Sequence, residues 1–192
     1  MQKPKLYLDF DGVIGNSIEA ITTLYNDDFQ AYPDFHPIMP EDIHTWNFLE
    51  CQCAPSEIFS VYFNTPRFYQ NLKFMNLADV MIWLLSYQFN LTIVSIGNPA
   101  NLKLKQKWID DNLRTYINGT NMVNQAETKF IGLEFSKFED KSCVDMSDGI
   151  FVDDTYDYLV SSNAKHKIVF GNEYPWNSDN EINNDTGIGE HY

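Results

Sequence analysis

Two aspartates, Asp9 and Asp11, are separated by a single residue where a short apolar run gives way to Gly12. Alternate residues of an extended chain point to the same side, so both carboxylates could share one target, although a turn starting at Asp11 would relax that geometry. Carboxylates this close repel each other unless a cation or a shared proton lies between them, and such oxygen ligands suit Mg²⁺. A solvated turn after a strand would also explain the pair, because Asp and Gly are common in turns. The pair alone leaves both interpretations open.

Polar side chains also end two later apolar runs. Ser95 follows the run 91–94, and Asp153 and Asp154 follow the run 149–152. If these runs are parallel strands of one sheet, their carboxyl ends converge on the edge where open α/β sheets bind ligands. Carboxylates there could hold Mg²⁺, while Ser95 and the backbone N–H groups of the next helix could hold an anion. A lysine would complete a phosphate site, because phosphoryl transfer needs mainly positioning and charge neutralisation.

The apolar patterns predict strands and helices that alternate, as in a doubly wound α/β fold with a parallel sheet. Asn98 and Pro99 are suited to cap and begin a helix. The predicted strands are 6–8, 91–94, 115–117, 130–135, 149–152 and 167–170. The predicted helices are 17–31, 56–63, 67–71, 77–87 and 99–113.

The segment 16–88 interrupts this alternation and is predicted to be a helical insertion. Four prolines fall within 32–55, yet the same stretch holds several aromatic residues, so it is too apolar for a plain linker. We therefore expect a core from 1–15 and 89–175 and a small helical cap at 16–88. A polar, acidic tail at 176–192 is expected to be mobile.

Composition restricts the classes of partner. The 192 residues are 44% hydrophobic, which is typical of a globular chain, and carry a net charge of −14. Proteins that grip a nucleic-acid backbone need Lys and Arg to neutralise phosphates, so we expect no nucleic-acid polymer as partner. A small anionic substrate is compatible if a metal ion and one or two lysines offset the field locally. No membrane-length or targeting run is evident, so we expect a cytoplasmic protein without a membrane partner. Three cysteines do not complete a zinc site, and four histidines match no ligand spacing.

The motifs, taken in order, resemble those of a known superfamily. Asp9-Phe10-Asp11-Gly12-Val13, Ser95, a lysine and Asp153-Asp154 resemble the four signature motifs of haloacid-dehalogenase-like (HAD) phosphohydrolases. Within them the chain is similar to the 5′(3′)-deoxyribonucleotidases over most of residues 5–175. The resemblance implies a Rossmann-like parallel core with a cap inserted after the first strand. Further segments that resemble that group are Asn71-Leu72-Lys73, Lys107-Trp108, Asp140-Lys141-Ser142 and 170–174.

The resemblance implies a role for each motif residue. Asp9 would attack phosphorus and become an aspartyl phosphate, and Asp11 would protonate the leaving oxygen and then activate water. Ser95 would bind a phosphate oxygen. Lys141 would stabilise charge on Asp9 and on the transferred group, with Lys137 as the alternative because the segment before Lys141 is longer than the family pattern.

A magnesium site is also implied by the resemblance. Asp153 would bind Mg²⁺ together with Asp9 and the backbone carbonyl of Asp11, and Asp154 would be a further ligand or its hydrogen-bonded support. The family often has Thr-Ser at the second motif. This chain has Val94-Ser95 followed by Ile96-Gly97, so its second motif departs from the family pattern where substrate contacts are expected.

The cap would close over the site, exclude water and select the leaving group. Trp46 is the first candidate for a base contact because it lies in an irregular segment among polar neighbours, and Phe48 and Ile96 are further candidates for substrate binding. Any single aromatic residue of the cap is more often part of its core. Arg67 could meet a base edge or a phosphate, although a surface charge needs no such role. Other aromatic residues that could line a base site are Phe63, Phe68 and Tyr69.

We therefore expect a Mg²⁺-dependent phosphomonoesterase, a nucleotidase that acts on (deoxy)nucleoside monophosphates, with a homodimer left open. One alternative is a phosphatase of another small phosphate ester such as a sugar phosphate. Another is a non-catalytic member that binds a nucleotide or a protein, but a pure binder has no need of both Asp9 and Asp11. A receiver domain is disfavoured because its phosphoacceptor Asp lies mid-chain, and no strand-end Asp lies between Asp11 and Ser95.

Overall fold

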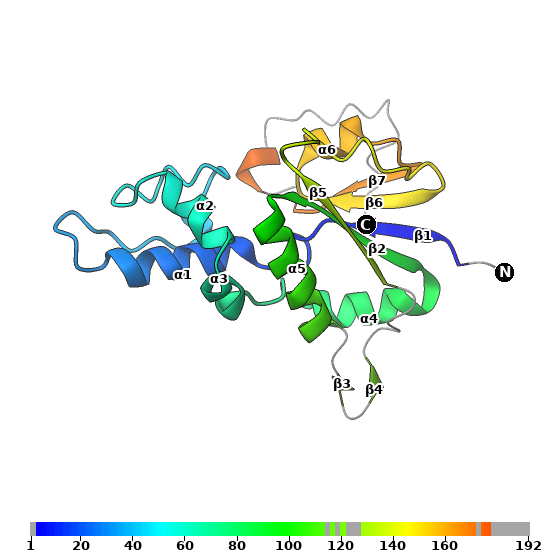
Figure 1. Cartoon of the computed structure of the whole chain (residues 1–192), viewed down its shortest axis with the longest axis horizontal. Helices are drawn as coiled ribbons and strands as arrows, with labels where there is room; N and C mark the ends of the chain where they lie inside the picture. Colours follow the sequence, from blue (N-terminus) through cyan, green and yellow to red (C-terminus); the bar gives the residue numbers. More distant parts are fainter. Residues whose placement is uncertain (1–2, 114–115, 118–119, 122–127, 172–173, 178–192) are drawn as a thin grey trace.

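A parallel sheet of five strands lies at the centre of the computed structural model (Figure 1). The strands are Lys5–Leu8 (β1), Asn90–Gly97 (β2), Lys129–Glu134 (β5), Gly149–Asp153 (β6) and His166–Val169 (β7). Their order is β5-β2-β1-β6-β7, and every neighbouring pair is parallel. The structure describes residues 3–113, 116–117, 120–121, 128–171 and 174–177.

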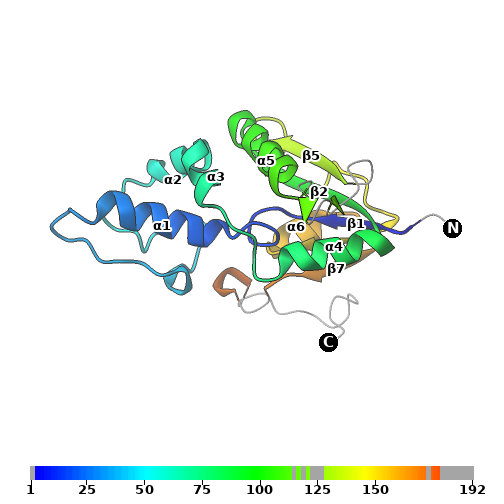
Figure 2. The same cartoon turned by 90° about the horizontal axis from the view of Figure 1, so that it is seen from below.

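Helices cover both faces of this sheet (Figures 1 and 2). They are α1 (Ser17–Phe29), α2 (Glu57–Phe63), α3 (Pro66–Asn71), α4 (Ala78–Gln88), α5 (Pro99–Asn112) and α6 (Tyr156–Ser161), with the short 3₁₀ helices η1 (Pro40–Asp42) and η2 (Pro175–Asn177). Leu6 and Leu8 of β1 share a core cluster with residues of α4 and α5, whereas Tyr7 packs in a second cluster with Leu159 of α6. The predicted doubly wound α/β fold is therefore confirmed. None of the helices described has the length and apolarity to cross a bilayer.

Asparagine caps begin the two long helices nearest the strand ends. The side chain of Asn16 accepts a hydrogen bond from the N–H of Glu19 at the start of α1, at 3.2 Å. At the start of α5, Asn98 accepts from the N–H of Asn101 at 3.0 Å, and Pro99 is the first helical residue. These caps satisfy N–H groups that a helix start leaves without partners. The predicted beginning of the helix after β2 is thus confirmed.

The segment between β1 and β2 divides into two parts. Helices α1, α2 and α3 contact one another, whereas α4 contacts β2. We call residues 16–74 the lobe; it extends beyond the sheet on one side in both views (Figures 1 and 2). The chain enters and leaves the lobe along one path, because Gly15 forms a β-bridge with Phe74. The division of the chain into a core and a 16–88 cap stays a prediction. Within the range 16–88, α4 contacts strand β2 of the sheet.

Two other predicted segments, the strand 115–117 and the tail 176–192, are described only in part. Tyr116–Ile117 (β3) pairs antiparallel with Thr120–Asn121 (β4), apart from the main sheet, while Thr115 lies outside the described residues. Of the predicted tail, Trp176 and Asn177 belong to η2, and residues 178–192 lie outside the described part of the chain.

Two neighbouring residues of the lobe allow a test of how much a core side chain and a surface side chain contribute to the free energy of unfolding. Phe68 is fully buried in α3, and its neighbour Arg67 is half-exposed and pairs with Asp28 of α1 at 2.6 Å. We expect Phe68→Ala to lower the free energy of unfolding by about 3–5 kcal/mol through lost burial and a cavity. Arg67→Met should cost less than about 1 kcal/mol, because exposed ion pairs contribute little. Urea unfolding of both variants measures the difference, and equal losses would contradict it.

Candidate active site

Three carboxylates meet where β1 and β6 end. Asp9 follows β1, Asp153 ends β6 and Asp154 comes next, and all three are buried. One oxygen from each lies within 4.8 Å of the others. The Oδ2 atom of Asp154 is buried without a hydrogen-bond partner. A buried carboxylate oxygen without a donor is costly, and a hard divalent cation such as Mg²⁺ would satisfy it, so the residues present fit a metal site.

Lys141 supplies the nearest positive charge to these carboxylates. Its Nζ atom lies 2.6 Å from an oxygen of Asp9 and 2.6 Å from an oxygen of Asp153, and the side chain is fully buried. The alternative lysine, Lys137, is exposed and pairs with Glu134 at 2.7 Å. The geometry therefore places Lys141, and not Lys137, against the acidic cluster.

The cluster holds three acidic groups against one ammonium. Burial raises the pKa of Asp9, and the nearby Lys141 opposes this shift. Burial, together with the charge of Asp9, raises the pKa of Asp153 to about 7 and that of Asp154 well above its usual value. The buried ionised cluster is thus unfavourable on its own, and a cation would relieve it.

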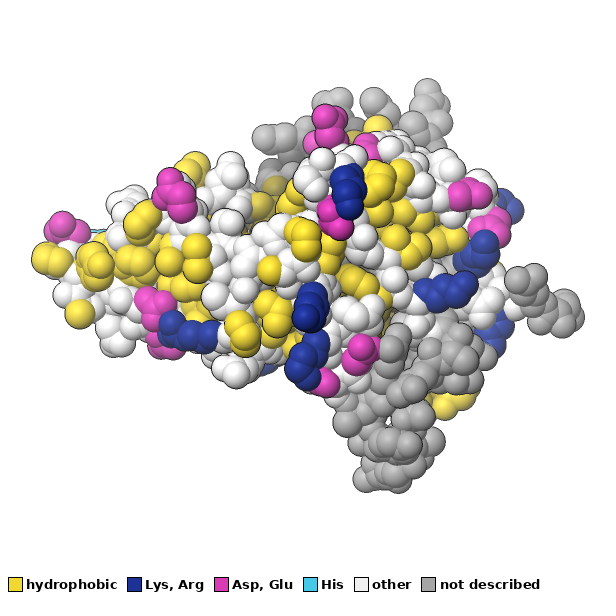
Figure 3. Space-filling view, viewed as in Figure 1, with side chains coloured by type: hydrophobic (Ala, Val, Ile, Leu, Met, Phe, Trp, Pro, Cys, Tyr) yellow, Lys and Arg dark blue, Asp and Glu magenta, His cyan; other side chains and the backbone are white. Residues whose placement is uncertain are grey.

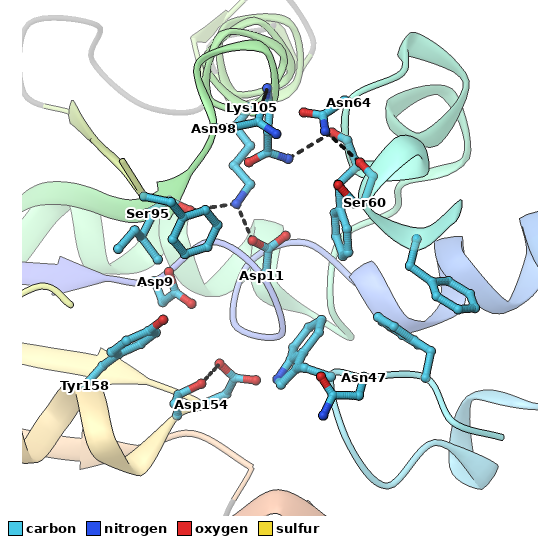
Figure 4. Close-up of a pocket in the computed structure, with 18 of the residues that line it drawn as sticks. Asp9, Asp11, Asn47, Ser60, Asn64, Ser95, Asn98, Lys105, Asp154 and Tyr158 are labelled. Atoms are coloured by element: carbon cyan, nitrogen blue, oxygen red, sulfur yellow. Dashed lines mark hydrogen bonds and ion pairs between the residues drawn. The ribbon is translucent and has the colours of Figure 1, made fainter. Parts of the chain in front are cut away.

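A second ammonium, that of Lys105, lies across the pocket (Figure 4). Lys105 is buried on α5, pairs with Oδ2 of Asp11 and donates to Oγ of Ser95 at 2.8 Å. The other oxygen of Asp11 accepts a hydrogen bond from Ser17 Oγ at 2.6 Å. Both oxygens of Asp11 are therefore engaged away from the three clustered carboxylates.

Glycine at position 12 permits the approach of Asp154. Gly12 has a φ of +71°, in the left-handed region that favours glycine, and a Cβ there would collide with the carboxylate of Asp154. The turn that ends β1 therefore brings its backbone against the end of β6.

Three carboxylates and two lysines form the floor of a pocket of about 670 Å³, and the other wall of this pocket is the lobe. These floor residues are Asp9, Asp11, Asp154, Lys105 and Lys141. Figure 4 shows Ser60, Asn64 and Asn47 facing the strand-end residues across this space. The lobe residues that line it are uncharged: Trp46, Asn47, Phe48, Leu49, Ser56, Phe59, Ser60, Phe63 and Asn64. The pocket therefore joins a charged floor to an aromatic and amide-bearing wall.

The sequence profile of one family matches residues 3–178, described as 5′ nucleotidase, deoxy (pyrimidine), cytosolic type C protein (NT5C). The chain belongs to this family. Among curated proteins, the sequence comparison finds no match. Membership in the NT5C family and the HAD-like fold supports a phosphohydrolase, as the motifs indicated.

Solved structures share the fold of this NT5C family member at low sequence identity. The HAD-like family protein SP0104 from Streptococcus pneumoniae has a TM-score of 0.56 at 12% identity, with 92% of this chain and 89% of that chain covered. A predicted phosphatase from Clostridium acetobutylicum has a TM-score of 0.52 at 15% identity and coverages of 96% and 91%. A putative phosphoglycolate phosphatase from Lactobacillus plantarum has 0.51 at 15%, with 97% and 92% covered. These likenesses show the HAD fold.

The structure of this NT5C family member brings the predicted substrate residues to the pocket. Trp46, Phe48, Ser95 and Ile96 all line it. Phe63, a further cap candidate, also lines the pocket. The other cap candidates have different contacts: Phe68 is in the lobe core, Tyr69 accepts a hydrogen bond from Asn101 of α5, and Arg67 pairs with Asp28.

Sequence reasoning missed several residues of this site. Lys105 was overlooked, although it lies three residues after Leu102 and three before Trp108, on the buried face of α5, where a charge is unexpected. Tyr158 lines the pocket with its ring 4.8 Å from Lys141 Nζ, and no periodic signal marked it.

The metal site can be tested through stability. A raised carboxyl pKa means that the protonated form is favoured in the folded chain. Stability is therefore lost as the pH rises above the pKa that the same carboxyl has in the unfolded chain. We expect Asp154→Asn to raise the metal-free melting temperature at pH 8 by about 2–8 °C and to reduce the stabilisation by Mg²⁺. Asp34→Asn, which removes an exposed charge, should change neither quantity. Differential scanning calorimetry with and without Mg²⁺ measures both quantities. An undiminished Mg²⁺ effect in Asp154→Asn would contradict the assignment of Asp154 to the metal site.

Proposed function

We propose that this chain is a Mg²⁺-dependent phosphomonoesterase that hydrolyses (deoxy)nucleoside monophosphates through an aspartyl phosphate. The observation that carries the proposal is the meeting of Asp9, Lys141 and the Asp153-Asp154 pair, of which Asp9, Lys141 and Asp154 line a pocket whose facing wall is uncharged and aromatic. In such a pocket a phosphoryl group faces cations, and a flat leaving group faces aromatic rings.

In the first step, a carboxylate oxygen of Asp9 attacks phosphorus. The bond between phosphorus and the nucleoside oxygen breaks, and that oxygen takes its electron pair together with a proton from Asp11. Ser95 and the ammonium groups of Lys105 and Lys141 offset the charge of the phosphoryl oxygens. The products are the free nucleoside and phosphorylated Asp9.

In the second step, Asp11 accepts a proton from water, and the water oxygen attacks the phosphorus on Asp9. The bond between phosphorus and the Asp9 oxygen breaks, which restores the carboxylate and releases inorganic phosphate. Ser17 and Lys105 hold the Asp11 side chain toward the pocket in both steps.

Asp9, Asp153 and Asp154 would hold Mg²⁺ with their carboxylates, and the backbone carbonyl of Asp11 is a further proposed ligand. Bound Mg²⁺ would supply positive charge to the phosphate and to the attacking carboxylate. The side chain of Asp11 is left for proton transfer, because it is not one of the three clustered carboxylates.

The pocket wall favours a nucleoside over a charged leaving group. A leaving group with a carboxylate or a second phosphate would need a cation on the lobe, and the lobe residues that line the pocket carry none. The rings of Trp46 and Phe48 could pack against a base. The Oδ1 atom of Asn64 is buried without a partner and could accept from a base N–H group.

The surface also suits a small substrate. On the face shown in Figure 3, Lys and Arg side chains lie scattered among Asp and Glu, without a continuous basic surface. A nucleic-acid polymer binds through many phosphates at once and needs such a surface. A cytoplasmic location accords with the family description, and the homodimer stays a prediction.

Phosphate release from a panel of substrates tests the function. We expect Mg²⁺-dependent hydrolysis of deoxy- and ribonucleoside monophosphates, with kcat/KM at least about tenfold above those of sugar phosphates and phosphoglycolate. Asp9→Asn should abolish turnover, because it removes the nucleophile. A profile that favours sugar phosphates would support the alternative substrate class, and nucleotide binding without hydrolysis of any substrate would support the non-catalytic alternative.

Lys105 and Lys107 form a matched pair on α5. Lys105 is buried against Asp11 and Ser95, whereas Lys107 is exposed and pairs with Asp111 at 2.6 Å. We expect Lys105→Met to lower kcat about 10²-fold or more, as the loss of a donor to a developing charge does in other enzymes. Lys107→Met should stay within about twofold. Steady-state kinetics measure both, and near-equal effects of the two substitutions would remove Lys105 from the catalytic set.

A further inference from the structure

The 3₁₀ helix η2 contacts both sides of the proposed site. In Figure 1 this orange segment lies between the lobe and the sheet. Trp176 Nε1 and Asn177 Nδ2 both donate to the backbone carbonyl of Asp154, at 3.0 and 2.8 Å. Asn177 Nδ2 also donates to the carbonyl of Gly171 at 3.1 Å, and Asn177 is buried. Two side chains of η2 thus fix the residue that carries the unpartnered carboxylate oxygen.

The ring of Trp176 lies against Trp46 in the lobe, with ring centroids 5.5 Å apart. Trp46 belongs to an irregular segment without a helix or strand to hold it. Its other ring contact is Phe48, at 6.0 Å, and its side chain lines the pocket. The orientation of Trp46 therefore depends on rings from two separate parts of the chain.

We infer that Trp176 and Asn177 act as a clasp that positions the metal-binding Asp154 and the pocket-lining Trp46, and so sets the affinities for the divalent cation and for aromatic leaving groups. The inference has two parts: the substrate arm concerns the affinity for aromatic leaving groups, and the metal arm concerns the affinity for the divalent cation. The substrate arm rests on the proposed nucleotidase function. Neither residue lines the pocket, so both are positioning residues.

The two arms of the clasp use different atoms, which makes them separable. The ring of Trp176 acts on Trp46, and the donors Trp176 Nε1 and Asn177 Nδ2 act on Asp154. Trp176→Phe keeps a ring and loses a donor. Trp176→Ala loses both, and Asn177→Ala loses its donor while leaving the ring in place.

The substrate arm predicts a change in KM that depends on the leaving group. Trp176→Ala should raise KM for nucleoside monophosphates about three- to tenfold, the size expected for one lost aromatic pair, and should leave kcat within about threefold. KM for ribose 5-phosphate, which lacks a base, should not change. Trp176→Phe should restore most of the nucleotide KM. Trp46→Ala should raise the same KM, and its effect should not add to that of Trp176→Ala in the double variant.

The metal arm is measured without substrate. Asn177→Ala should raise the dissociation constant of Mg²⁺ about tenfold, as the loss of a group that supports a metal ligand commonly does, while the nucleotide KM at saturating Mg²⁺ stays unchanged. Isothermal titration calorimetry and the Mg²⁺-dependent melting temperature give the constant. Matched controls are Trp83→Ala on α4 and Asn112→Ala, whose side chain also donates to a backbone carbonyl, that of Trp108.

Each outcome decides one arm. Equal KM increases for nucleotides and ribose 5-phosphate, or additive effects of Trp46→Ala and Trp176→Ala, would overturn the substrate arm. An unchanged Mg²⁺ dissociation constant in Asn177→Ala would overturn the metal arm. If the wild-type chain hydrolyses no nucleotide, the proposed function and the substrate arm fail together, and the calorimetric test of the metal arm still stands. If Trp176→Ala does not fold, Trp176→Phe and Trp46→Ala carry the test: a nucleotide KM near the wild-type value in the first and a raised one in the second are expected.

Discussion

The buried ammonium of Lys141 between Asp9 and Asp153 is the interaction on which the site depends. It bridges residues at the ends of adjacent strands, and each distance is that of a strong charge-assisted hydrogen bond. An unpaired ion in this position would cost several kcal/mol, so the three groups are stable only together. The addition of Asp154 leaves the cluster with excess negative charge. That excess would favour a divalent cation at this sheet edge, and it also makes the metal-free site less favourable than its packing alone would suggest.

A second buried ammonium separates two roles that neighbouring carboxylates could otherwise share. Lys105 and Ser17 engage both oxygens of Asp11 and turn that side chain away from the acidic cluster. Asp9, two residues earlier, faces Lys141 instead. Of the two geometries that the sequence left open, a shared target or one relaxed by a turn at Asp11, the side-chain contacts match the second. In the proposed mechanism, this separation assigns the attack on phosphorus to Asp9 and the proton transfer to Asp11.

Strand-end residues were predictable because a parallel sheet forces the carboxyl ends of its strands together. This rule brought Asp9, Ser95 and Asp153 to one edge without any knowledge of side-chain contacts. Lys141 lies outside regular structure, so the resemblance to a family was needed to select it. Lys105 could have been found from its place on an apolar helix face.

Trp176 could not have been found, because its role arises from contacts with Asp154 and Trp46 that no local pattern encodes. The polar composition that follows it in the chain favoured a tail. The aromatic residues of the lobe were ambiguous for a similar reason. Helical spacing does not distinguish Phe68, which fills the lobe core, from Phe63, which lines the pocket.

The attachment of the lobe determines what its movement would require. The two chain segments that connect the lobe to the sheet run side by side. They are joined by hydrogen bonds from Asn16 N to Lys73 O and from Met75 N to Ile14 O. A pair of adjacent connecting segments is the usual form of a hinge, because few backbone dihedrals need to change there. The contact between Trp46 and Trp176 joins the lobe to η2. Opening of the lobe would therefore separate these rings or displace η2 from the carbonyl of Asp154, which would link access to the pocket mechanically to the position of the proposed metal ligand.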